Sequence, residues 1–175
     1  MGIVVLPYDP EWPAKAAAEL EAVADALSGA IDAIEHIGST AVPGLAAKPI
    51  VDLMAASPDF AAVRSRADRL AAIGYIGADN GMPGRLLFHK TEGGMPVNLH
   101  VVPTATWETR NQRLLRDYLR ANPKDARRYG DLKLALARET ADGDDYSRKK
   151  TALIQELMDR ARAERGLPPV DVWED

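Results

Sequence analysis

Residues 34–54 read IEHIGSTAVPGLAAKPIVDLM, a pattern that predicts a strand, a Gly-Ser turn, a short loop and a second, buried strand. Gly38 has no Cβ, so the backbone there can approach a ligand closely. Asp52 lies within an apolar run, where a carboxylate is unfavourable unless it is hydrogen-bonded, paired or bound to a metal. With the Ser39 hydroxyl and the Lys48 ammonium, these groups are the components of a phosphate-and-metal site.

Four more motifs are spread along the chain: VVLPYDPEWP at 4–13, NLHV at 98–101, RDYLRANP at 116–123 and YSRKKT at 146–151. Together with the Gly-Ser turn they resemble, in order and nearly end to end, the GrpB family of bacterial proteins. That family belongs by fold to the nucleotidyltransferase superfamily. The resemblance implies a fold, but a fold does not by itself determine an activity.

The composition limits the classes of protein to which this chain can belong. The 175 residues are 46% hydrophobic and 27% charged, which is typical of a globular protein of one-domain size. The net charge of −4 argues against a dedicated nucleic-acid binder. The absence of cysteine excludes disulfides and thiolate chemistry. We see no signal peptide and no apolar run near the ~20 residues of a membrane span, so we expect a cytoplasmic protein with no membrane partner.

Periodicity predicts strands and helices in alternation, followed by helices alone. We expect strands at 3–6, 31–37, 49–55, 74–78, 85–90 and 97–102, the last two forming a hairpin. We expect helices that start at Asp9-Pro10, at Ser57-Pro58 and near Thr106, and then at 124–139 and 145–164. The pattern alone favours α/β or α+β. The resemblance selects a nucleotidyltransferase-like mixed β-sheet flanked by helices, with a helical C-terminal third. We predict one domain over 1–166 and a loosely ordered tail at 167–175.

The expected metal site centres on Asp52. Proteins resembling this one place two acids one residue apart on the strand after the turn, so that both point to the same face. Here the second position is Met54, and a thioether is a poor ligand for Mg²⁺. We expect Asp52 to hold Mg²⁺ or Mn²⁺, but not a two-metal centre. The structural alternative is that Asp52 caps backbone amides of the Gly38-Ser39 turn.

Alternation places Asn98 and His100 on one face of their strand. His100 is a candidate metal ligand, general base or phosphate partner, and Asn98 a candidate supporting residue. A partly buried histidine bonded to a carbonyl is the alternative for His100. His36 is expected to orient Asp52, or else to be satisfied by Glu35 or a nearby aspartate. His89 is expected to be solvated or at an edge.

Basic side chains are the expected partners of the phosphates. We select Lys48, Arg85 and Lys150, and interpret Arg110 and Arg113 as exposed surface charges. Gly38 and Ser39 are expected to cradle the same group.

Two functional hypotheses follow. The first is an enzyme that transfers a nucleotidyl group from a nucleoside triphosphate to a small acceptor, with Asp52 and His100 as catalytic residues. The second is a non-catalytic module that binds a nucleotide or phosphorylated small molecule and whose metal site has degenerated. Domains resembling this family also occur beside coenzyme A biosynthesis kinases, which suits a regulatory role.

Overall fold

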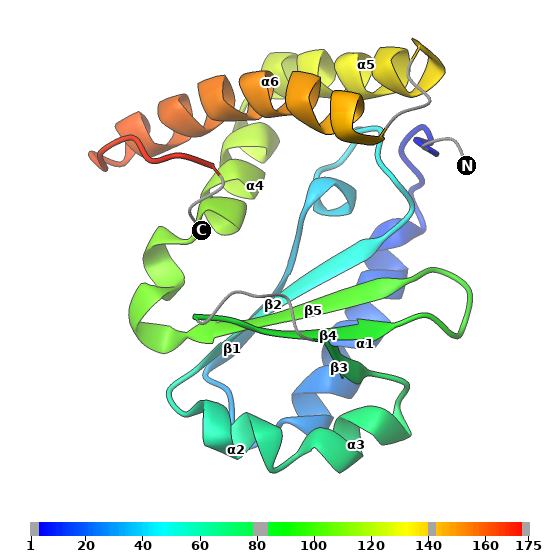
Figure 1. Ribbon diagram of the computed structural model, residues 1–175, viewed down its shortest axis with the longest axis vertical. Coiled ribbons are helices and arrows are strands. Elements are labelled where there is room, and N and C mark those ends of the chain that lie inside the picture. The colour runs from blue at the N-terminus through cyan, green and yellow to red at the C-terminus, as the bar shows by residue number, and fades with distance from the viewer. Residues whose placement is uncertain (1–3, 79–83, 140–142, 173–175) are drawn as a thin grey trace. The chain divides into compact units, whose positions relative to one another are not determined.

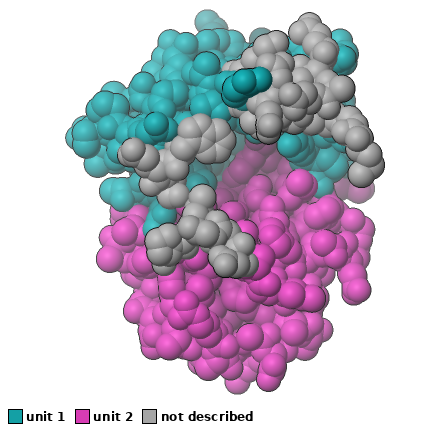
Figure 2. Space-filling view, viewed as in Figure 1, with its two compact units in different colours: residues 1–10, 42–49, 109–175 teal, residues 11–41, 50–108 magenta. Residues whose placement is uncertain are grey.

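The computed structural model describes residues 4–78, 84–139 and 143–172. The chain divides into two compact units, coloured separately in Figure 2. The sheet unit comprises residues 11–41 and 50–108, and the helical unit comprises residues 1–10, 42–49 and 109–175. The stretch NGMPG at 80–84, which its glycines predict to be a loop, lies almost wholly outside the described residues.

The sheet unit is built on one mixed sheet (Figure 1). Its strands are β1 (Ala33–Ile37), β2 (Val51–Ser57), β3 (Ile76–Ala78), β4 (Leu86–Lys90) and β5 (Val97–Pro103). Their order is β1-β2-β5-β4-β3, with β2 and β5 parallel and all other neighbours antiparallel. The predicted mixed sheet and the β4–β5 hairpin are therefore confirmed. The expected strand at 3–6 is reduced, among the described residues, to a bridge between Leu6 and Ala47.

Helices cover one face of this sheet. α1 (Trp12–Ala26) crosses that face in Figure 1, and α2 (Phe60–Arg64) and α3 (Ala67–Ala72) complete the layer. Its core combines buried residues of α1, β2 and β5, among them Val23, Leu53 and Leu99. Two 3₁₀ turns, Ser39–Ala41 and Thr104–Thr109, flank the strands.

Three predicted helix starts differ from the observed ones. The helix expected near Thr106 starts later, as α4 (Asn111–Ala121), because the 3₁₀ turn Thr104–Thr109 precedes it. α1 starts at Trp12 instead of Asp9-Pro10, because Pro13 occupies the first turn and Glu11 the cap position. The helix expected from Ser57-Pro58 starts later, since Ser57 still belongs to β2 and Asp59 accepts a hydrogen bond from the Ala61 amide at 3.0 Å.

That second helix is also interrupted. The Ser65 hydroxyl donates to the Ala62 carbonyl at 2.7 Å, in competition with the helical backbone. Two short helices, α2 and α3, therefore replace the single one expected.

The helical unit contains α4 (Asn111–Ala121), α5 (Pro123–Glu139) and α6 (Gly143–Glu164). The helix predicted at 124–139 is confirmed, and it starts one residue earlier because Pro123 opens α5. Leu45, from the 42–49 loop, is 1% exposed and belongs to the helical core. A Cβ on Gly130 of α5 would lie 3.1 Å from Leu45 Cδ1, so this glycine lets the helix approach the loop.

Hydrogen bonds join the described end of the chain to α6. Gln155 Nε2 donates to the Val170 carbonyl at 2.8 Å, and its Oε1 accepts from the Val172 amide at 3.2 Å. Arg162 Nε donates to the Pro168 carbonyl at 2.7 Å. Residues 168–172 are thereby held against α6. In the part of the chain that is described, no helix is both long enough and apolar enough to cross a membrane.

Candidate functional site

The face of the sheet opposite α1 carries a group of polar side chains. Asp52 lies opposite Asn98 in the register of β2 and β5, and Met54 lies opposite His100. Residues paired across strands point to the same face, so Asp52, Asn98 and His100 share this face. The alternation in the sequence predicted the pairing of Asn98 with His100, and the register adds Asp52.

Asp52 is the centre of this group. Its side chain is 30% exposed, and its Oδ1 accepts a hydrogen bond from Asn98 Nδ2 at 3.2 Å. The same oxygen lies 3.7 Å from His100 Nε2, which is an ion-pair distance but too long for a hydrogen bond. The carboxylate is therefore partly accessible to solvent. It also has polar neighbours, because it faces an amide and an imidazole.

His89 continues this network. Its Nδ1 lies 2.6 Å from Asn98 Oδ1. Because a carboxylate only accepts hydrogen bonds, Asn98 presents its NH₂ to Asp52 and its oxygen to His89, which donates from Nδ1. The expectation that His89 is solvated or a plain edge residue is wrong. Its place beside Asn98 depends on the β4–β5 register, which local sequence does not reveal.

The Gly38 turn lies directly against the Asp52 carboxylate. Gly38 has a φ of +77°, and a Cβ at this position would lie 2.8 Å from Asp52 Oδ2. Real side chains do not approach that closely, so only glycine fits. The turn then forms one 3₁₀ turn, with the Ala41 amide bonded to the Gly38 carbonyl at 3.1 Å. Ser39 is the first residue of that turn.

His36 supports the turn. The register places it opposite Leu53, while Ile37 lies opposite Asp52. Its side chain therefore belongs to the other face of the sheet. The Thr40 hydroxyl donates to the Ile50 carbonyl at 3.1 Å and so accepts from His36 Nε2, 2.9 Å away. The contacts shown for His36 thus fix the turn to the start of β2, and its predicted role in orienting Asp52 stays a prediction.

Met54 is fully buried in an apolar cluster with Ile37, Val102 and Trp107. Within residues 4–78, 84–139 and 143–172, no three His, Cys, Asp or Glu side chains form a group that could hold a metal ion. The protein residues alone therefore do not build a metal centre. They fit an ion that already carries phosphate oxygens, because Mg²⁺ is commonly held by one carboxylate together with the phosphates of its substrate.

Sequence reasoning missed Glu35 as a possible member of this face. Its Cα lies opposite Met54 in the β1–β2 register, so a second carboxylate comes from the neighbouring strand. The sequence does indicate that Glu35 and Ile37 share one face of β1, because they lie two residues apart. Finding it required the register between the two strands.

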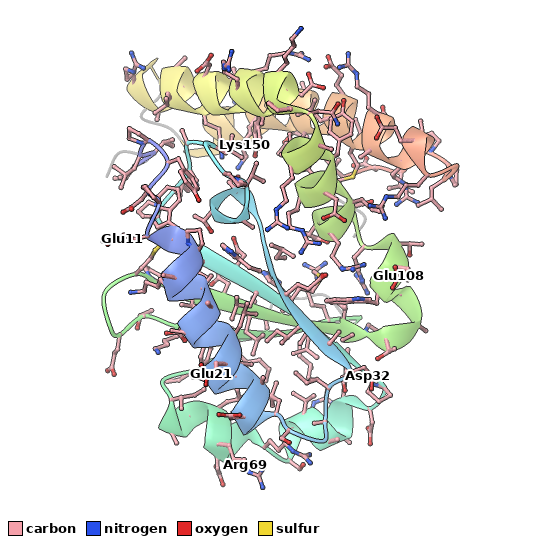
Figure 3. All side chains as sticks on the ribbon, turned by 180° about the vertical axis from the view of Figure 1, so that it is seen from behind. Glu11, Glu21, Asp32, Arg69, Glu108 and Lys150 are labelled. Carbon is pink, nitrogen blue, oxygen red and sulfur yellow. The ribbon has the colours of Figure 1, made fainter. Side chains whose placement is uncertain are left out.

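The predicted basic residues fall in both units. Arg85 immediately precedes β4 in the sheet unit and is 8% exposed. Lys48 lies in the 42–49 loop and Lys150 lies on α6, where Figure 3 labels it; both belong to the helical unit. The sheet unit thus brings together Gly38, Ser39, Asp52, Asn98 and His100, while Lys48 and Lys150 belong to the helical unit, where both affect the pKa of a third lysine, Lys133.

Lys133 is a second residue that sequence reasoning missed. It is 2% exposed, and its ammonium lies 4.4 Å from the centre of the Tyr129 ring. Burial, followed by repulsion from Lys150 and Lys48, lowers the pKa of Lys133 to about 7. The signal in the sequence is a lysine on the apolar stripe of a helix.

A pocket of about 550 Å³ also lies in the helical unit, and none of the predicted site residues lines it. Apolar residues such as Tyr8, Pro43 and Leu119 form much of its wall, with Arg120 and Arg127 beside them.

The mixed sheet and its helices have a nucleotidyltransferase-like fold. Consistent with this, 74% of the chain aligns with 42% of the Cid1 poly(U) polymerase bound to MgGTP, with a TM-score of 0.52 at 18% identity, a likeness of fold. Residues 2–160 match the GrpB protein family, and the chain belongs to it.

Relatives within the family align over nearly the whole chain. The crystal structure of the conserved protein GrpB from Enterococcus faecalis has a TM-score of 0.84 and 32% identity, over 93% of this chain and 99% of that one. A UPF0157 protein of Pseudomonas aeruginosa is 40% identical over 170 residues, covering 92% of this chain and 68% of its own length. Both the family and the fold expected from the sequence are confirmed.

Proposed function

We propose that this protein binds a nucleoside triphosphate at the Gly38-Ser39 turn and transfers its nucleotidyl group to a small acceptor. The observation that carries the proposal is the 2.8 Å approach of Asp52 Oδ2 to the Cβ position of Gly38. A carboxylate held against a glycine turn is a group that would hold a divalent metal ion when a triphosphate is bound. The fold likeness to Cid1, whose structure holds MgGTP, supports the same ligand class.

Each residue of the sheet site has a role in this proposal. Asp52 holds Mg²⁺ or Mn²⁺, which neutralises charge on the phosphates when bound. Asn98 keeps the carboxylate in place, and Gly38 and Ser39 offer backbone and hydroxyl donors. Arg85 adds positive charge in the same unit.

His100 is the proposed general base. Its Nε2 faces the Asp52 carboxylate, which stabilises the imidazolium that forms when the ring takes a proton from an acceptor hydroxyl. Its Nδ1 is buried and, among the described residues, has no hydrogen-bond partner. The proton to be transferred is therefore taken at Nε2.

The alternative is binding without catalysis, and the burial of Met54 favours it. A methionine packed in an apolar cluster has replaced a metal ligand, so the site offers only one carboxylate on β2. Pyrophosphate release separates the two functions. An enzyme releases pyrophosphate from a nucleoside triphosphate in the presence of an acceptor, whereas a binding module does not.

The test is calorimetric titration of the four nucleoside triphosphates with Mg²⁺ and, separately, with EDTA. We expect metal-dependent binding that Asp52→Asn weakens at least about tenfold, the effect of losing one charge-assisted contact. Asp68→Asn is the matched control, because Asp68 is an exposed aspartate on α3 of the same unit. Binding unaffected by Asp52→Asn, or absent for all four nucleotides, contradicts the proposal.

A further inference from the structure

Three separate parts of the sequence meet at the pocket of the helical unit. The VVLPYDPEWP motif, the stretch after the Gly-Ser turn and the RDYLRANP motif each contribute a proline to its wall: Pro7, Pro43 and Pro123. All the residues that line the pocket belong to this one unit. None of the three prolines takes part in the site around Asp52, so the proposed function leaves this convergence unexplained.

Small residues of α5 make room for the pocket. Ala126 and Gly130 lie four residues apart and therefore on one face of the helix, and both line the pocket. Leu134 continues the same row one turn further on. The resulting volume of about 550 Å³ falls within the range of about 300–1,000 Å³ that is usual for sites of small molecules. The pocket therefore has the size and the apolar wall of a ligand site.

Charged side chains line the pocket beside this apolar wall. Arg120, Arg127 and Asp131 are all exposed, and together they carry one net positive charge. A guanidinium group matches the two oxygens of a carboxylate in a planar fork. The ring of Tyr8 adds a flat apolar surface with a hydroxyl group at its edge. This lining complements a molecule that has a flat apolar body and a single negative charge.

We infer that the pocket binds a small aromatic carboxylate, with the ring against the prolines and Tyr8 and the carboxylate near Arg127. Apolar surface of both partners leaves water when the ring binds. The carboxylate stays at the exposed charged residues and keeps much of its hydration, which avoids the cost of burying a charge. The inference concerns the helical unit alone and does not depend on the site around Asp52.

The experiment is an NMR titration of the ¹⁵N-labelled full chain with 2-naphthoate in EDTA. We expect saturable shifts of the amide signals of Gly44 and Gly130, which line the pocket. 2-Naphthamide has the same ring system without the charge, and it should bind about fivefold more weakly. Asp52→Asn should leave the affinity for 2-naphthoate unchanged, which separates this test from that of the proposed function.

Three variants test the charges and the space. Arg127→Met should weaken the binding of 2-naphthoate about fivefold, an effect limited by the exposure of the arginine. Arg138→Met is the matched control, because Arg138 is an exposed arginine of α5 outside the lining, and it should leave the affinity unchanged. Leu134→Trp places a larger side chain in the lining and should abolish binding.

If Leu134→Trp does not fold, Asp131→Asn supplies a second measurement at an exposed position. It removes the opposing charge and should strengthen the binding of 2-naphthoate about twofold. Absence of saturable binding, or shifts confined to amides outside the pocket, overturns the inference. Equal affinities of Arg127→Met and Arg138→Met, or of the original chain for 2-naphthoate and 2-naphthamide, overturn it as well.

Discussion

The two units differ in the surroundings of their polar side chains. In the sheet unit, Asp52 is 30% exposed and is surrounded by an amide and an imidazole that complement its charge. In the helical unit, Lys133 is 2% exposed, and burial, followed by repulsion from Lys150 and Lys48, lowers its pKa to about 7. The first arrangement stabilises the carboxylate without a ligand and leaves part of it accessible to one. In the second, burial disfavours the charged form of the lysine.

The largest expected effect comes from trying to restore the missing acid. Met54→Asp puts a carboxylate into a fully buried apolar position, near Asp52, and should lower the free energy of unfolding by about 3–5 kcal/mol. Met54→Leu, a change that nearly conserves volume, should lower it by less than about 1.5 kcal/mol. Urea unfolding measures both. Equal stability of the two variants would show that the position tolerates a charge and is part of the polar face.

Gly38→Ala should have the next largest effect, because the new methyl meets the Asp52 carboxylate and the φ of +77° is strained for alanine. We expect a loss of more than about 2 kcal/mol in the free energy of unfolding and loss of nucleotide binding.

Gly44→Ala is the matched control for that change. Gly44 has nearly the same φ, +80°, but nothing lies within 4 Å of its Cβ position. Gly44→Ala should lower the free energy of unfolding by only about 1 kcal/mol, the contribution of backbone strain. Equal losses for the two variants would mean that the contact with Asp52 contributes nothing.

In the helical unit, replacing a buried charged residue by an apolar one should stabilise the protein. Lys133→Met should raise the free energy of unfolding at pH 6 by about 1–2 kcal/mol, since it removes a buried charge but also its contact with the Tyr129 ring.

The sign of the pH dependence follows from the lowered pKa. Below pH 7 the folded and unfolded chains both carry the proton on Lys133, so the folded chain bears the full free-energy cost of a buried ammonium. Between pH 7 and 10.5 only the unfolded chain holds it, so the stability of the original chain rises with pH. The advantage of Lys133→Met should therefore shrink over this range in thermal unfolding. Lys124→Met, a change at an exposed lysine on the same helix, should show no such trend, and a constant advantage for Lys133→Met would contradict the account.

The smallest effect concerns the support of Asp52. Asn98→Ala and His89→Ala should each lower the free energy of unfolding by about 1 kcal/mol, the usual contribution of one hydrogen bond. Because Asn98 links His89 to Asp52, the double variant should lose less than the sum of the single losses. Strict additivity in urea unfolding would mean that the two residues act independently.

Much of the sheet could be predicted because its strands are continuous apolar runs with clear turns. The shared face of Asn98 and His100 follows from alternation alone. Glu35 and His89 could not be placed, because their positions depend on which strands pair and in which register. Lys48 and Lys150 were expected among the partners of the phosphates. Their effect on the pKa of Lys133 depends on how the 42–49 loop, α5 and α6 pack in the helical unit, which local sequence does not reveal. Helix starts were displaced by two or three residues where a second proline or acid offered a better cap.

The central claim is that Asp52 and the Gly38-Ser39 turn together hold a metal-bound triphosphate. Its most direct test is a crystal structure with Mn²⁺ and a non-hydrolysable nucleoside triphosphate, using anomalous scattering to locate the ion. The account predicts Mn²⁺ on the Asp52 carboxylate, with phosphate oxygens against the backbone of Gly38 and Ser39. A nucleotide bound elsewhere, or an ion that does not contact Asp52, would contradict it.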